Sequence, residues 1–85
     1  MKMDEQTWDE YVAPTITELN SKEEKEVLKI ICIKYYDTWY QEGYEIACKK
    51  GYEELASIYF AQGYVVGYGI SMVEKFFKCI ELLEG

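Results

Sequence analysis

The chain has 85 residues, of which 49% are hydrophobic, and its sixteen acidic residues outweigh nine lysines to give a net charge of −7. It contains no arginine and no histidine, and this balance argues against binding to duplex nucleic acid, which needs clustered cations. A chain of this length forms one small domain that buries only about 60% of the surface its unfolded form exposes. We therefore expect self-association to complete a marginal core.

The first predicted segment is an N-terminal arm over residues 1–20. Pro14 and the β-branched residues around it interrupt any long helix that begins near Asp4. A short helical turn is expected before this point, with Trp8 and Tyr11 three residues apart on one side of it. We expect these two rings to dock the arm against the main body.

The main body is predicted to be a helical hairpin over residues 21–85. Ser21 followed by Glu24 has the spacing of a capping box, so the first helix is expected to begin there. Two lysines followed by Gly51 are typical of a helix end, which predicts a turn near this glycine and a second helix over 54–83. The alternative is one continuous helix, because no proline interrupts this part of the chain.

Both predicted helices are apolar over much of their circumference, and the first offers more apolar surface than one partner helix covers. We therefore predict an all-α fold. It consists of a long antiparallel helical hairpin with a short N-terminal arm, and copies of it assemble into an oligomeric helical bundle.

The stretch 55–73 raises the alternative of a membrane span, because it carries no charged residue over nineteen positions. Gly63 and Gly67 within it have the small-xxx-small spacing of membrane helices. However, tyrosines lie in its middle rather than at its ends, and neither flank is basic. We expect a buried helix of a soluble oligomer and not a membrane span.

The three cysteines, Cys32, Cys48 and Cys79, have no C-x-x-C spacing, and no histidine completes a zinc site. We interpret them as reduced thiols that are buried in the helices of a cytoplasmic protein. The first residues also lack the apolar segment of a secretory signal. No metal site and no cofactor are predicted.

Four glycines are each followed by a tyrosine, and their separations of eight, twelve and four residues are all multiples of four. Residues four apart share a helix face, so this spacing predicts a track of small residues beside a track of rings. One interpretation is a close crossing of two helices or two subunits, since glycine inside a helix otherwise costs about 0.5–1 kcal/mol relative to alanine. The glycines expected to pack helices together are Gly43, Gly63, Gly67 and Gly69.

The other interpretation of the same track is a cavity for a planar ligand. The missing side chains would leave room, and aromatic rings would stack against a base. The residues expected to bind such a ligand are Tyr36, Trp39, Tyr40, Tyr64 and Tyr68.

The usual catalytic constellations are missing from the sequence, which has no histidine base, no paired cysteine and no glycine-rich loop after a strand. Carboxylate pairs occur in charge runs that are typical of solvated helix starts. We therefore do not expect an enzyme.

The run Phe60, Gly63, Tyr64 and Gly67, followed by Glu74, has the pattern aromatic-x-x-Gly-aromatic-x-x-Gly with a later acidic residue. It resembles small helical-hairpin proteins of unknown function from phages and mobile elements of low-GC Gram-positive bacteria. The resemblance covers about a third of the chain and implies a phage-associated helical hairpin in the bacterial cytoplasm.

The leading functional hypothesis is a non-enzymatic phage or mobile-element protein that antagonises bacterial defence. It would sequester a small nucleotide signal in the aromatic-lined groove of a homo-oligomer. One alternative is an acidic inhibitor or antitoxin that binds a basic surface of a host protein, in the manner of an anti-CRISPR protein that mimics nucleic acid. A purely structural helical oligomer is the other alternative.

Overall fold

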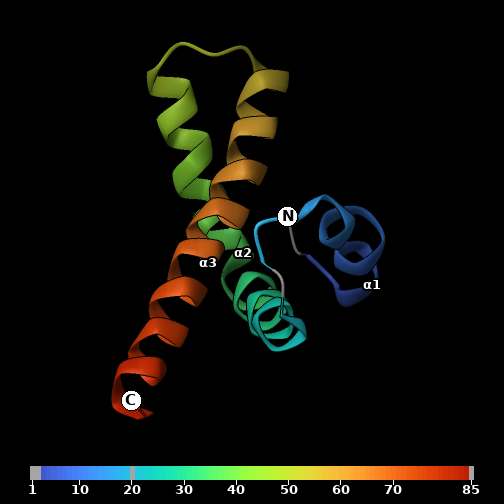
Figure 1. Ribbon diagram of the computed structural model, residues 1–85. Coiled ribbons are helices and arrows are strands. Elements are labelled where there is room, and N and C mark those ends of the chain that lie inside the picture. The colour runs from blue at the N-terminus through green and yellow to red at the C-terminus, as the bar shows by residue number, and fades with distance from the viewer. Residues whose placement is uncertain (1–2, 20, 85) are drawn as a thin grey trace.

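The computed structural model describes residues 3–19 and 21–84, and this part of the chain is almost entirely helical, with no strand in it. Two long helices pack against each other and are preceded by an arm of short helical turns (Figure 1). This confirms the predicted all-α class and the helical hairpin. The elements are α1 (Glu5–Thr7), the π-helical η1 (Trp8–Val12), the 3₁₀ turn η2 (Ala13–Thr15), α2 (Lys22–Lys49) and α3 (Glu54–Glu84).

Helix α2 begins where the sequence predicts it. Ser21 has an extended backbone, and its Oγ accepts a hydrogen bond of 3.0 Å from the backbone N–H of Glu24. A serine in this position satisfies one of the four backbone donors that a helix start leaves unpaired. Glu23 and Glu24 in the first turn add negative charge at the positive end of the helix dipole.

The turn between the long helices is a Schellman motif centred on Gly51. This glycine has φ of +82°, its N–H donates to the Cys48 carbonyl at 3.0 Å, and the Tyr52 N–H donates to the Ala47 carbonyl at 3.1 Å. The left-handed conformation favours glycine, and the two bonds satisfy carbonyls at the end of α2. The Ser57 hydroxyl donates to the Tyr52 carbonyl at 3.3 Å and fastens the start of α3. The chain is therefore a hairpin and not one continuous helix.

The helices α2 and α3 pack through rows of residues spaced mostly four apart. Interlocking of such rows is typical of helices that cross at about 50°. Figure 1 shows the two helices side by side near the turn, crossing near the middle of α3 and separating beyond it. The buried residues are Leu28, Cys32, Tyr36, Trp39, Gly43 and Ala47 on α2, and Ser57, Ala61, Val65, Gly69 and Val73 on α3.

The arm packs onto the hairpin through apolar side chains. Trp8 is 2% exposed and belongs to one hydrophobic cluster with Leu28 of α2 and Val73 of α3. On the arm's outer side, the Lys29 Nζ lies 2.8 Å from Glu5 Oε1 and 3.2 Å from Asp9 Oδ1. The hydrogen bonds with Glu5 and Asp9 raise the pKa of Lys29. One core thus holds the arm to both long helices.

The uncharged stretch 55–73 lies within α3, and its buried face packs inside the hairpin. Across residues 3–19 and 21–84, no helix combines the length and the apolar character that crossing a membrane would require.

Candidate functional site

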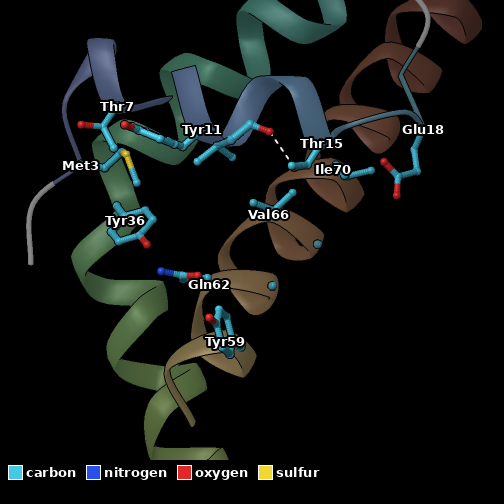
Figure 2. Close-up of a pocket in the computed structure, with 13 residues that line it drawn as sticks. Met3, Thr7, Tyr11, Thr15, Glu18, Tyr36, Tyr59, Gln62, Val66 and Ile70 are labelled. Carbon is cyan, nitrogen blue, oxygen red and sulfur yellow. Dashed lines mark hydrogen bonds between the residues drawn. The ribbon is translucent and has the colours of Figure 1, made fainter. Parts of the chain in front are cut away.

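A groove runs between the arm, α2 and one face of α3, and we call it the arm groove. Its volume is about 650 Å³. In Figure 2 the arm lies across one end, Tyr36 of α2 forms one side, and the labelled residues of α3 follow the other side. The groove is lined by Met3, Thr7, Tyr11, Val12, Thr15, Glu18, Tyr36, Tyr59, Gln62, Gly63, Val66, Gly67 and Ile70.

The lining combines rings with a few polar groups. Tyr11, Tyr36 and Tyr59 come from the arm, α2 and α3 respectively, so every wall offers an aromatic ring. Gln62 lies between the α2 and α3 sides, and its amide supplies both a donor and an acceptor (Figure 2). Among the lining residues that the structure describes, Glu18 is the one that carries a charge. Such a surface suits an uncharged ligand with a flat ring and a polar edge.

Two of the glycines predicted to pack helices border open space in the arm groove. A Cβ atom added at Gly63 or Gly67 would meet nothing within 4 Å. At Gly43, by contrast, an added Cβ would lie 2.8 Å from the Tyr64 Cβ, and at Gly69 it would lie 2.5 Å from the Cys32 Sγ. The crossing of α2 and α3 therefore depends on Gly43 and Gly69, whereas Gly63 and Gly67 leave room in the groove.

The five aromatic residues predicted to bind a ligand lie in two separate stacks. Tyr36 stacks on Tyr40 with ring centroids 5.7 Å apart, and of the five only Tyr36 lines the arm groove. Trp39 lies 4.9 Å from Tyr68, which in turn lies 5.8 Å from Tyr64. Neighbouring helix positions point about 100° apart, so a glycine and the tyrosine that follows it face different directions.

The second stack, which contains Trp39, Tyr64 and Tyr68, also makes a polar contact with α2. The Tyr64 hydroxyl donates a hydrogen bond of 3.2 Å to Glu42 Oε2. Desolvation, and then this bond, raise the pKa of Tyr64. Burial, with smaller effects from Tyr40 and Asp37, likewise raises the pKa of Tyr36. Both hydroxyls therefore stay protonated at neutral pH and keep a proton that can be donated to a hydrogen bond.

Several residues of the arm groove were not predicted from the sequence. Tyr59, Gln62, Val66 and Ile70 follow one another at intervals of three and four along α3. This spacing places them on the helix face that also carries Gly63. These residues could have been identified by taking the positions three and four residues away from the glycines of α3. Nothing in the sequence, however, indicates that Tyr11 of the arm lies across the groove from them.

The cysteines have different environments. Cys32 is buried, its Sγ donates to the Val65 carbonyl at 3.8 Å, and burial raises the pKa of this thiol to about 12. Cys48 and Cys79 are exposed, so the prediction that all three thiols are buried is wrong for these two. In the part of the chain that the structure describes, no group of three or more cysteine, aspartate or glutamate side chains is placed to hold a metal ion.

Comparison of the chain with protein-family models, with curated proteins and with solved structures found no match. The resemblance to phage-encoded helical hairpins stays a prediction from the sequence. The arm groove and the surface of the hairpin are therefore the features from which a function can be inferred.

Proposed function

We propose that this chain is a non-enzymatic binding protein that sequesters a small nucleobase-bearing molecule in the arm groove. The observation that carries the proposal is the combination of tyrosine rings, one amide and two open glycine positions around a single hollow of about 650 Å³. Ligand sites of small molecules have volumes of about 300–1,000 Å³ and mostly apolar walls with a few polar groups. The arm groove meets each of these conditions.

The recognition of a base follows from the chemistry of the walls. A purine or pyrimidine ring presents a flat π-face, and stacking on a tyrosine ring contributes about 1–3 kcal/mol per base. The amide of Gln62 can donate to and accept from the polar edge of the same ring. Gly63 and Gly67 let the ligand approach the backbone of α3, because no side chain stands in between.

The charge of the groove narrows the ligand class. Among residues 3–19 and 21–84, Glu18 lines the groove and no lysine does, and the whole chain carries a net charge of −7. A phosphate inside the groove would therefore meet repulsion, with no cation among the described lining residues to offset it. The site favours a nucleobase or nucleoside, and a nucleotide signal would hold its phosphates outside. Sequestration of such a signal by a phage or mobile-element protein is the biological role we propose.

Thermal unfolding with a panel of nucleosides and the matching 5′-monophosphates tests this function. A ligand that binds only the folded chain raises the melting temperature in proportion to its affinity and concentration. We expect at least one nucleoside to raise it, and to do so more than its monophosphate. No shift with any member of the panel, checked by calorimetric titration, would refute the proposal.

A matched pair of variants locates the site. Tyr59 lines the arm groove and Tyr68 does not, and both rings are partly exposed on α3. We expect Tyr59→Ala to weaken nucleoside binding at least tenfold and Tyr68→Ala to leave it unchanged. The reverse result would move the site to the stack of Trp39, Tyr64 and Tyr68.

A second candidate function is the binding of a basic protein surface. It is supported by the exposed carboxylates at the starts of the long helices, where Glu23, Glu53 and Glu54 lie on the surface. Association through such charges weakens steeply as salt rises, because exposed charges are screened over about 10 Å at 0.1 M ionic strength. A partner retained at 0.1 M salt and released at 0.5 M would support this function, and it requires no ligand in the arm groove.

A further inference from the structure

An apolar stripe follows the C-terminal part of α3, and we call it the C-terminal stripe. It consists of Met72, Phe76, Cys79 and Leu83, which are spaced four, three and four residues apart. This is the spacing of the a and d positions in helices that pair along a seam. All four residues are exposed, with Phe76 at 52% and Leu83 at 87%. The stripe therefore has the pattern of a helix interface without being covered.

The stripe lies on the face of α3 that is buried earlier in the same helix, whereas the buried row itself turns to a neighbouring face at Val73. Val65 and Gly69 precede Met72 by seven and three residues, and both are buried against α2. Beyond this point the two long helices separate (Figure 1). The same face of α3 thus passes from the inside of the hairpin onto its surface.

The solvent-accessible area of the chain can be compared with the area that an interface needs. The chain exposes 6181 Å², whereas a compact monomer of its mass exposes about 5,200 Å². The difference is roughly 900 Å², and a stable protein interface buries roughly 800 Å² on each partner. The whole chain therefore exposes enough additional area to supply one interface of this size.

The charge of this segment favours a second copy over a charged partner. Residues 72–84 carry three glutamates and two lysines, so the segment is close to neutral although the chain carries −7. Helix geometry places Glu74, Lys78 and Glu81 on the side away from the stripe. Two copies that meet here bring little like charge together.

We propose that the C-terminal stripe is the interface of a homodimer, in which the α3 helices of two copies pair along Met72, Phe76, Cys79 and Leu83. The contact is isologous, with the same stripe contributed by each chain. None of these residues lines the arm groove. Dimer formation is therefore independent of the proposed ligand site, and the failure of one does not decide the other.

Sedimentation equilibrium of the full chain, from low micromolar to several hundred micromolar, tests the dimer. We expect a mass of twice 10.0 kDa in the upper part of this range. The double variant Phe76→Gln, Leu83→Gln removes apolar surface from the stripe, and we expect its dimer dissociation constant to rise about a hundredfold or more. Circular dichroism checks that the variant stays helical, which the exposure of both side chains favours.

The double variant Glu74→Gln, Glu81→Gln is the matched control, since it introduces the same residues on the opposite side of α3. We expect it to dimerise like the unmodified chain. A monomer throughout the concentration range would overturn the proposal. An unmodified dissociation constant in the stripe variant, or an equal loss in the control, would overturn it as well.

Discussion

Gly69 of α3 faces Cys32 of α2 so closely that a Cβ atom on the glycine would lie 2.5 Å from the cysteine Sγ. The added Cβ atom would also lie 2.9 Å from the Leu28 Cδ1. Cys32 and Leu28 are both almost fully buried, so neither side chain can turn into solvent to make room. Glycine at position 69 and a small thiol at position 32 together allow this approach of the helices.

We predict that Gly69→Ala lowers the free energy of unfolding by about 1–3 kcal/mol, the usual cost of extra volume in a packed core. In a chain that already carries Cys32→Ala the cost should be smaller, because the nearest obstacle is gone. Urea unfolding of the two single variants and the double variant gives the coupling energy. If the changes in unfolding free energy of the two single variants simply add up in the double variant, the thiol is not the obstacle.

The remaining glycines allow the same substitution to be compared at a packed and an open position. Gly43→Ala should destabilise the hairpin, since the new Cβ meets Tyr64 and the backbone of Ala61 at 3.1 Å. Gly63→Ala should stabilise it by about 0.5–1 kcal/mol, because alanine favours the helix and nothing stands in its way. Chemical denaturation measures both. A destabilised Gly63→Ala chain would indicate that another helix packs at this position.

Trp8 should contribute most of the arm's attachment to the hairpin. Truncation of a buried tryptophan to alanine costs about 3–5 kcal/mol, and Trp8 is 2% exposed. We expect Trp8→Ala to release the arm, lower the stability measured in urea and weaken any ligand of the arm groove. Tyr11→Ala serves as the control for stability, because Tyr11 is 71% exposed and should change it by less than about 0.5 kcal/mol.

The thiols should differ in reactivity and in their effect on stability at high pH. A soluble thiol reagent should modify Cys48 and Cys79 in the native chain, and Cys32 only after unfolding, since it is buried with a pKa of about 12. Above pH 9 the unfolded thiol ionises while the folded one keeps its proton. The contribution of the Cys32 thiol to the free energy of unfolding is therefore fully present below pH 9 and is lost between pH 9 and pH 12.

The Cys32→Ala chain lacks this ionisation, so its stability should fall less steeply over the same pH range. Urea unfolding at several pH values measures both slopes. Tyrosine and lysine ionisation affects both chains alike, so the difference between the slopes isolates the thiol. Equal slopes would contradict the burial of an uncharged thiol at the helix crossing.

The sequence was sufficient to predict the elements whose signals are local. Ser21 and Glu24 mark a helix start through a contact three residues apart, and Gly51 marks the turn through its own backbone conformation. Neither signal depends on how distant parts of the chain pack. The all-α hairpin could therefore be predicted before any tertiary contact was known.

The division of the glycines and rings could not be predicted in this way. Residues four apart advance about 40° around the helix with each step, so a row spaced by fours gradually changes the neighbour it faces. Gly69 meets α2 while Gly63 and Gly67 border the arm groove. Which position meets which partner depends on the crossing of the helices and on where the arm docks, and neither is encoded in a short stretch of sequence.

The glycine turn also has a consequence for how the chain acquires its structure. Contacts such as that of Gly43 with Tyr64 close short loops around Gly51, whereas the Cys32–Val65 contact closes a longer one. We expect the contacts between α2 and α3 to form first near the turn and then progressively farther from it, and the arm to attach last. A ribosome makes the arm and α2 first, so the apolar face of α2 must wait uncovered until α3 emerges. We therefore expect the arm, which is synthesised first, to be the last part of the chain to pack.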